Sequence, residues 1–422
     1  MLRIPAFLFL FCTLISLSGI AQSVISGRVV NATSQEPVAG ASVFISNTSK
    51  GTVSDKNGYF ELGDISSGKY DLVISSVGYE TNAFSFSSAQ LPLNLKVEMQ
   101  VKVRTLENVV VEPSVEEGWD KWGRLFIENF LGMTPAAEQC KIKNEKSIRF
   151  RFYKKSNRII AYCDEPIIVE NKSLGYRIKY QLESFEVRFR EGSSAYTGFA
   201  LFEDMDEKKK EVRRRWRQSR DKAFYGSMMH FMRATYENTL VAEGFEVRRM
   251  VRTYNLEKQR VRELYRQQAR VSSGNVLSVR VGGNNNAPVI QSKDSVGTDS
   301  SAYYNRILNQ DDYTDVYARE TLTADSLLYA VHPGFKEIYF PNYLLITYKK
   351  ETEDPAYLAY HREKRSVTFQ RSLVWLINPV TIAIYPDGSY YPPDQIFSSA
   401  YWGWSEKMAE MLPLDFRPYD KK

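Results

Sequence analysis

The sequence has only three histidines, at positions 230, 332 and 361, in a chain of 422 residues. A catalytic zinc site of the carboxypeptidase kind takes two histidines and a carboxylate as ligands, and it opens with His-x-x-Glu. His361 and Glu363 have the wrong spacing for that motif, and no His-Glu-x-x-His occurs. His230 lies on the apolar stripe of an expected helix, where a packed core residue is the simpler interpretation. We therefore expect no zinc catalysis and no other cofactor.

Other catalytic signatures are also missing. The chain has no Gly-x-Ser-x-Gly nucleophile motif and no Walker phosphate loop. A pair of acids on separate strands leaves no local signature, so a hydrolase of peptide or polysaccharide stays open as an alternative. Glu165, Glu183 and Glu186 are candidates for it by position, against the simpler interpretation that they are surface carboxylates.

Long apolar runs are missing after the first 21 residues, so we expect no transmembrane helix in the mature chain. The N-terminus itself has Arg3, an apolar run over residues 4–20 and a small-x-small site at Gly19-Ile20-Ala21. These features predict a cleaved secretory signal peptide at residues 1–21. Cys12 lacks the small preceding residues of a lipidation site, and an uncleaved anchor is the alternative. We expect an exported protein, periplasmic or associated with the outer membrane.

Residues 24–79 show a strand pattern. Ile25, Gly27 and Val29 share one face and alternate with polar residues, which is the period of a half-buried strand. Asn57-Gly58 suits a type I′ turn, so residues 51–55 and 59–62 are expected to pair as a hairpin. About seven short strands without helical periodicity predict an all-β, two-layer antiparallel sandwich.

This N-terminal region also carries an ordered set of motifs. They are Ile25-Ser26-Gly27, Pro37-Val38-Ala39-Gly40-Ala41, Gly51-Thr52-Val53-Ser54-Asp55, Asn57-Gly58-Tyr59-Phe60 and Val77-Gly78-Tyr79. With them, residues 22–112, including the trailing 106–111, resemble the carboxypeptidase regulatory-like domain, which has a transthyretin-like fold. The resemblance implies an accessory module without a zinc site or catalysis, of the kind found at the N-termini of exported proteins of Bacteroidetes-type bacteria.

Residues 113–422 predict a larger α+β domain, with a split into two domains near the 282–301 loop as the alternative. The expected elements are a helix at 116–131, strands between 140 and 205, a helical insert at about 206–270 with a strand at 244–254, an exposed loop at 282–301, and a helix at 399–411. A change of parity at Glu183-Ser184 indicates a β-bulge. Pro386-Asp387-Gly388 predicts a hairpin turn.

The mature chain keeps two cysteines, Cys140 and Cys163. Both fall in strands that we expect to be adjacent, so in an oxidising compartment they could form a disulfide. Two buried thiols are an equally good interpretation, and the sequence leaves both open.

Positive charge is concentrated in one short segment. Residues 208–220 hold eight Lys or Arg and one Glu, whereas the whole chain has a net charge of +6. The eight cations are Lys208, Lys209, Lys210, Arg213, Arg214, Arg215, Arg217 and Arg220. They predict a surface for an anionic partner, and lipid A phosphates or acidic polysaccharide suit an exported protein better than nucleic acid. The alternative is the solvated face of a surface helix.

Together these features favour an exported, non-enzymatic envelope protein. Its sandwich would be a docking module, and residues 113–422 would bind or assemble with an envelope protein or glycan. Carbohydrate binding through the sandwich itself is a further alternative. Exposed aromatic side chains could also bind sugar rings, although Trp119, Trp122, Trp402 and Trp404 have helical spacings typical of core packing. A concave pocket with converging acids would favour the hydrolase, and a flat aromatic surface would favour binding.

Overall fold

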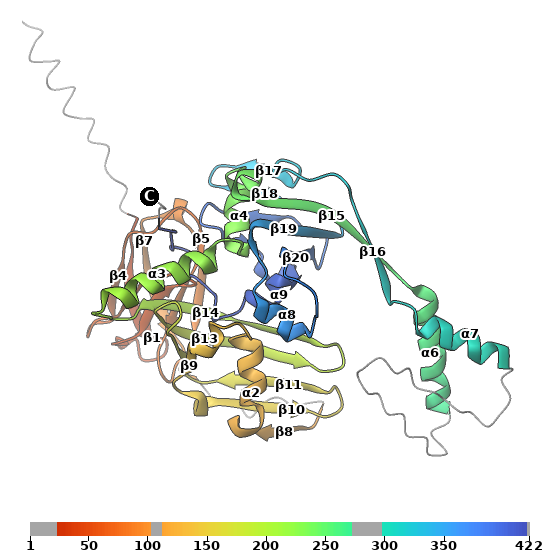
Figure 1. Cartoon of the computed structure of the whole chain (residues 1–422). Coiled ribbons are helices and arrows are strands. Elements are labelled where there is room, and N and C mark those ends of the chain that lie inside the picture. The colour runs from red at the N-terminus through yellow and green to blue at the C-terminus, as the bar shows by residue number, and fades with distance from the viewer. Residues whose placement is uncertain (1–22, 103–111, 272–297, 420–422) are drawn as a thin grey trace, which may run out of the picture.

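The computed structural model describes residues 23–102, 112–271 and 298–419, and the fold is mostly β-sheet (Figure 1). The predictions for the signal peptide at 1–21, for residues 106–111 and for most of the 282–301 loop lie outside the described residues. Helix α7 (Thr298–Leu308) includes the last four positions of that predicted loop.

The N-terminal region forms two facing sheets around one core. Its strands are β1 (Ile25–Asn31), β2 (Ser42–Ile45), β3 (Gly51–Val53), β4 (Tyr59–Leu62), β5 (Lys69–Ser75), β6 (Asn82–Ser87) and β7 (Leu93–Met99). The sheet orders are β4-β1-β7 and β3-β2-β5-β6. Ile25 and Val29 of β1 are fully buried between the sheets, as their alternation predicts. The structure thus has the seven strands expected from the sequence, but β1 and β7 pair in parallel, so the prediction of a wholly antiparallel sandwich is wrong for that pair.

The predicted hairpin at Asn57-Gly58 is wrong. Strand β3 pairs with β2 and β4 pairs with β1, so the turn carries the chain from one sheet to the other. The turn is stable without strand pairing because the Asp55 carboxylate accepts hydrogen bonds from the backbone N–H groups of Asn57 and Tyr59 (both 2.8 Å). Gly58 supplies a positive φ of 81°.

After the sandwich the chain forms a seven-stranded sheet, which builds the second core and which we call the second sheet. Its order is β8-β10-β11-β13-β12-β9, with β14 paired to β13. Its strands are β8 (Ser114–Glu117), β9 (Cys140–Ile142), β10 (Ile148–Tyr153), β11 (Arg158–Cys163), β12 (Ile167–Asn171), β13 (Tyr176–Arg188) and β14 (Ser193–Asp204). Helix α2 (Trp119–Phe130) covers it, and the ring of Phe126 lies 4.7 Å from that of Phe185. The register shift between Leu182 and Ser184 confirms the predicted bulge.

A third core lies between the remaining sheets and helices. The sheet orders are β16-β15-β19-β20-β23 and β17-β18-β21-β22. The strands are β15 (Phe245–Tyr254), β16 (Tyr313–Tyr317), β17 (Leu328–His332), β18 (Phe335–Ile338), β19 (Tyr343–Thr352), β20 (Phe369–Leu376), β21 (Ile382–Ile384), β22 (Tyr390–Tyr391) and β23 (Ile396–Ala400). Pairing of β21 with β22 confirms the hairpin predicted around Asp387.

The helices of the predicted 206–270 insert do not pack together as one unit. They are α3 (Lys210–Phe224), α4 (Met228–Tyr236), α5 (Leu240–Glu243) and α6 (Leu256–Val271), and β15 lies among them as the strand pattern predicts. Phe224 of α3 belongs to the second core, whereas Phe231 of α4 belongs to the third. Strands β15 and β16 carry α6 and α7 away from the rest of the molecule (Figure 1). The two later helices are α8 (Pro355–His361) and α9 (Tyr401–Ser405), so the helix predicted at 399–411 is shorter than expected.

The sandwich is fastened to the second sheet rather than free. In the turn after β2, Asn47 N–H donates to the Ala200 carbonyl (2.7 Å). The carbonyl of Thr48 in the same turn accepts from Phe202 N–H (3.0 Å). Phe44 and Val73, on the outer side of their sheet, are buried with Leu201 of β14. One face of the proposed docking module is therefore used within the chain.

Candidate functional site

Five residues lie opposite one another in a straight row across the five-stranded sheet. The row is Tyr317 (β16), Met250 (β15), Tyr343 (β19), Trp375 (β20) and Phe397 (β23), in direct register from strand to strand. Four ladder steps of ~4.8 Å make it about 19 Å long. Its residues are outside the third core, whose side chains come from the opposite face of the same strands. We call it the aromatic row.

The aromatic row is partly open to solvent. Tyr317 is 48% exposed and Phe397 is 38% exposed, Tyr343 and Trp375 are half-buried, and Met250 is fully buried between them. The Trp375 ring lies 5.4 Å from that of Tyr343 and 5.8 Å from that of Phe397, at angles of 48° and 43°. The rings therefore pack against one another in tilted pairs and do not form one flat platform.

Charged groups border the aromatic row. Arg252 forms a bidentate pair with Asp315 (2.8 Å to each oxygen), and its guanidinium lies 3.7 Å from the centre of the Tyr313 ring. Arg371 lies on the same face of β20 as Trp375. Its side chain is exposed and has no partner among the residues described. Aromatic residues, Met and Arg are the types enriched at protein interfaces.

A second feature is a cavity of about 230 Å³ where the second and third cores meet. Four carboxyl groups are among its lining residues, and we call it the carboxylate cavity. They belong to Glu351 and Asp354 at the end of β19 and to Glu406 and Glu410 after α9. Met228 N–H, at the start of α4, donates to Glu406 Oε1 (3.1 Å), and Thr134 hydrogen-bonds Glu410.

Two of these carboxyl groups have strongly shifted pKa values. Burial raises the pKa of Glu406 to about 7, and the neighbouring Glu410 adds to the rise. Burial likewise raises the pKa of Glu410 to about 7, with the Asp354 charge acting in the same direction and Lys222 opposing it. Desolvation disfavours the charged form of a carboxyl group, so each group is only partly ionised near pH 7. Shifts of this kind are common at functional sites.

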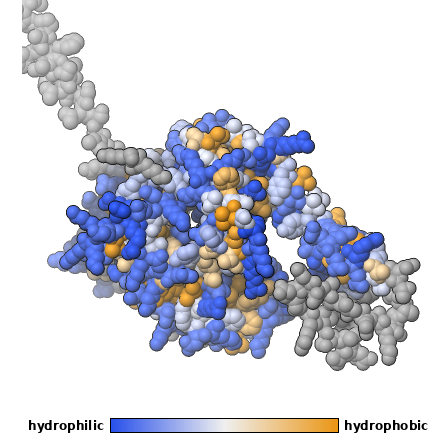
Figure 2. Space-filling view, in the orientation of Figure 1, coloured by the Kyte–Doolittle hydropathy of each residue, from blue (hydrophilic) through white to orange (hydrophobic). Residues whose placement is uncertain are grey.

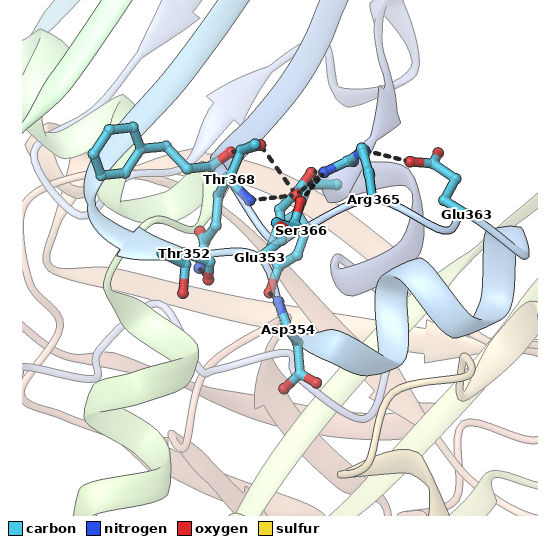
Figure 3. Close-up of polar contacts among 10 residues, drawn as sticks. Thr352, Glu353, Asp354, Glu363, Arg365, Ser366 and Thr368 are labelled. Carbon is cyan, nitrogen blue, oxygen red and sulfur yellow. Dashed lines mark hydrogen bonds and ion pairs between the residues drawn. The ribbon is translucent and has the colours of Figure 1, made fainter.

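Glu353 positions the β19 end of the cavity, although it does not line it. Its buried carboxylate accepts two bonds from Arg365 (2.6 and 3.0 Å) and one from Thr368 N–H (3.0 Å). Figure 3 shows this network on one side of the strand and Asp354 pointing to the other. Asp354 also caps α8 by accepting from Ala356 N–H (3.0 Å). The end of β19 is thus held firmly beside the cavity.

The structure brings two of the three acids suggested by the sequence to one cavity and leaves the third outside it. Glu165 and Glu183 line another cavity, of about 580 Å³, between the sandwich and the second sheet. Glu186 instead pairs with Arg158 (2.9 Å). Hydrogen bonds from Ser147 and Asn144 lower the pKa of Glu165, whereas burial raises that of Glu183. The carboxylate cavity was missed because its four acids come from two segments that are far apart in the sequence.

His230 is a packed core residue, as predicted. Its Nδ1 accepts from Gly226 N–H (3.1 Å), so its Nε2 carries the proton toward Glu243 (3.3 Å). Burial lowers the pKa of His230 to about 4. Within the described ranges, no three His, Cys, Asp or Glu side chains are grouped as a metal site.

Cys140 and Cys163 are free thiols in the structure, with Cys163 buried and Cys140 half-buried. The expectation of adjacent strands is wrong, because Cys140 lies opposite Asn171 on β12 and Cys163 lies opposite Ile148 on β10. Burial raises the pKa of the Cys140 thiol to about 12.

The basic segment lies on and just before α3. Seven of its eight cations are exposed and have no ion pair with any described residue: Lys208, Lys209, Lys210, Arg213, Arg214, Arg215 and Arg217. Figure 2 shows a hydrophilic surface over this helix. Arg220 must be removed from the predicted patch, because it is 8% exposed and donates to the Leu174 (2.7 Å) and Gly175 (3.1 Å) carbonyls and to Asp204 (2.6 Å).

The other aromatic candidates are core residues, as their spacing predicts. Trp402 and Trp404 are buried in the third core, and Trp119 and Trp122 pack on the second. Trp375 was not singled out from the sequence, although Phe369, Arg371, Leu373 and Trp375 alternate along one strand.

Comparison with known proteins confirms the N-terminal resemblance. Residues 25–111 match the family model of the CarboxypepD_reg-like domain. Among solved structures, the chain is similar to a cohesin–X-dockerin complex of Acetivibrio cellulolyticus (29% identity, 18% of this chain and 57% of that one, TM-score 0.17). It is also similar to the Bacillus anthracis TIE protein (11% identity, 44% and 32%, TM-score 0.16). The chain thus spans less than two-thirds of either, and such TM-scores do not establish a common fold. No curated protein matches.

None of the helices in the described part of the chain has the length and apolar character needed to span a bilayer.

Proposed function

We propose that this chain is an exported, non-catalytic protein of the bacterial envelope that binds a protein partner through the aromatic row. The observation that carries the proposal is the row itself, with five residues in register on the face turned away from the core. Export is supported by the N-terminal sequence, and a non-catalytic role is supported by the regulatory-like sandwich.

The geometry favours protein over carbohydrate as the partner. A sugar ring lies flat on an aromatic face, whereas the rings of the aromatic row are tilted by 43–48° toward one another. Such a surface suits interlocking side chains, and buried Trp, Tyr and Arg dominate the binding energy of protein interfaces. Arg371 at the border would pair with an acidic residue of the partner. We therefore assign a partner with an apolar centre and an acidic rim.

A photo-crosslinking residue in place of Phe397 tests this function. The full chain is expressed with its own N-terminal segment in a host that exports it, and the envelope is irradiated. A discrete crosslinked protein is expected from position 397 and not from position 59, where Tyr59 is 55% exposed on the sandwich. Trp375→Ala should weaken binding of the captured partner at least ~10-fold, as for a central interface residue. Equal capture at both positions, or none at 397, refutes the proposal.

A hydrolase is the second candidate function, and one observation favours it. The carboxylate cavity brings together two protonatable carboxyl groups, Glu406 and Glu410, each with a pKa of about 7. A carboxyl group poised near neutral pH can act as a general acid or base. Turnover of chromogenic glycosides or peptides that is lost in Glu410→Gln would support this candidate, and no turnover by the intact chain would exclude it for those substrates.

A further inference from the structure

The cavity of about 580 Å³ between the sandwich and the second sheet begins where the apolar contact between them ends. Phe44 of β2 and Val73 of β5 make that contact. Two residues from each of them, on the same side of its strand, are Ser42 and Ser75, which lie opposite one another in register and line the cavity. Neither hydroxyl has a hydrogen-bond partner among the residues described. We call this space the serine cavity.

The second sheet contributes a buried amide to the serine cavity. Tyr180 and Leu182 of β13 belong to the second core, so Gln181 between them lies on the face turned to the sandwich. Gln181 is 8% exposed, and its side-chain amide has no hydrogen-bond partner in the described part of the chain. The unpaired side-chain atoms that are sealed from solvent there belong to Asp387 and Trp404 instead. The amide therefore keeps an exposed surface, and this surface opens into the cavity that Gln181 lines.

An unpaired amide in this position indicates a missing partner, because buried polar groups are almost always hydrogen-bonded. The amide of Gln181 offers an NH₂ donor and a carbonyl acceptor side by side, and a serine hydroxyl both donates and accepts. Two neighbouring hydroxyl groups of a ligand match such an amide, since one accepts from the NH₂ and the other donates to the carbonyl. The volume of about 580 Å³ falls within the range of small-molecule sites, roughly 300–1,000 Å³.

The charges around the serine cavity disfavour an anionic ligand and leave little for a cationic one. Four carboxylates line it, against the single ammonium group of Lys102 among the described lining residues. Asp164 already pairs with Lys102 (2.9 Å) and with Arg149 (2.6 Å). Glu165 accepts from the Asn144 amide (3.0 Å). A neutral ligand with hydroxyl donors is therefore the class that these walls favour.

The walls of the serine cavity also differ from those of a peptide site. Strands β2 and β5 lie inside the sandwich sheet, and β13 has neighbours on both sides, so their backbone groups are used in the sheets. Peptides that bind sheets add to a free edge, and others fill apolar pockets. Here the aliphatic lining side chains offer little, because Val77 is 88% exposed and Leu182 belongs to the second core.

We propose that the serine cavity binds a short neutral saccharide. Neighbouring hydroxyl groups of a sugar ring pair with the amide of Gln181, and hydroxyl groups on the other side of the ring pair with Ser42 and Ser75. This site belongs to the sandwich and the second sheet, whereas the aromatic row belongs to the five-stranded sheet. The proposal therefore adds a second binding function, and it depends neither on the protein partner nor on any bond being broken.

Calorimetry and thermal shift on the full chain test the proposal with defined probes. Maltotriose, cellotriose, mannotriose and triacetylchitotriose are the neutral probes, because they share hydroxyl-bearing rings and differ in linkage and stereochemistry. At least one of them should bind and raise the melting temperature in proportion to the logarithm of its concentration. Trigalacturonic acid has the same number of rings with carboxylates, so it should not bind. N-acetyl-triserine amide has hydroxyl groups on a neutral peptide, and it should not bind either.

Three variants test the residues with the neutral probe that binds most tightly. Gln181→Leu should weaken its binding roughly 10-fold, because two neutral hydrogen bonds are lost, and should leave the melting temperature of the free protein equal or higher. Ser42→Ala and Ser75→Ala should each weaken binding roughly 5-fold. Ser26→Ala is the matched control, because Ser26 is half-buried on the outer face of the other sandwich sheet.

Absence of binding by all four neutral probes, or equal binding of trigalacturonic acid, overturns the proposal. Tighter binding of the triserine peptide than of any saccharide also overturns it, since the cavity would then recognise a peptide. Unchanged affinity in Gln181→Leu, with a normal melting temperature, has the same consequence. Capture of a partner by crosslinking at position 397 tests a different surface, so failure of one proposal is distinguishable from failure of the other.

Discussion

Replacing Glu406 with glutamine should stabilise the protein at high pH and leave it unchanged at low pH. The pKa of Glu406 is raised from 4.5 to about 7 by burial, so the folded state binds a proton more tightly than the unfolded state does. Stability from this group is therefore fully present below pH ~4.5 and is lost as pH rises toward 7. A rise in the pKa of Glu406 from 4.5 to about 7 corresponds to about 3 kcal/mol of folding free energy. Glutamine resembles the neutral acid and can still accept from Met228 N–H.

The assay is the melting temperature of wild type and Glu406→Gln at half-unit steps from pH 4 to pH 8.5. The two proteins should have similar melting temperatures near pH 4, and the variant should become more stable by several degrees at pH 8. Most of the difference should develop between pH 4.5 and pH 7. Glu237→Gln serves as the control, because Glu237 is exposed at the end of α4, and it should follow the wild-type profile throughout.

Glu406 and Glu410 should not titrate independently. Glu410 contributes to the raised pKa of Glu406, so removing one negative charge lowers the pKa of the other. The double variant should therefore gain less at pH 8 than the two single gains added together. A Glu406→Gln profile parallel to wild type, or a loss of stability at every pH, would refute the burial of an ionisable carboxyl group at this position.

Three further results are expected. Arg220→Met should lower the free energy of unfolding by about 2–3 kcal/mol in thermal or urea unfolding, because it leaves buried carbonyls unpaired. Arg214→Met, at an exposed position, should change it by no more than about 0.5 kcal/mol. Equal effects of the two substitutions would contradict the structural role of Arg220. Gly175→Ala should cost at least about 2 kcal/mol in the same assay, since Gly175 has φ of +72° and an added Cβ would lie 2.2 Å from the Trp216 ring. If α3 binds anionic surfaces, the pair Arg213→Gln and Arg214→Gln should weaken sedimentation with phosphatidylglycerol vesicles by roughly 30-fold at low salt; binding unaffected by salt would argue against it.

Local periodicity predicted which segments become strands and helices, because burial on one face acts through neighbouring residues. The alternation in β1, the amphipathic spacing of α2 and the parity change at Glu183-Ser184 are of this kind. Pairing partners were less predictable. Asn57-Gly58 forms a tight turn in either arrangement, and which sheet receives β4 depends on the register of β1, which the turn does not determine. The cysteines were misplaced for the same reason.

The aromatic row and the carboxylate cavity both depend on contacts between segments that are far apart in the sequence. This explains why neither site was predicted from the sequence. Trp375 has the alternation of an ordinary strand residue, and it becomes part of a binding surface only because its register places Tyr343 and Phe397 beside it. Likewise, Glu406 is an unremarkable acid in its own segment. Burial raises its pKa, and the hydrogen bond from Met228 N–H, 178 positions earlier at the start of α4, opposes that rise. Substitutions that change the register of β20 should therefore abolish the aromatic row without changing its residues. Those that disturb the α4 start should change the titration of Glu406 and leave the row intact.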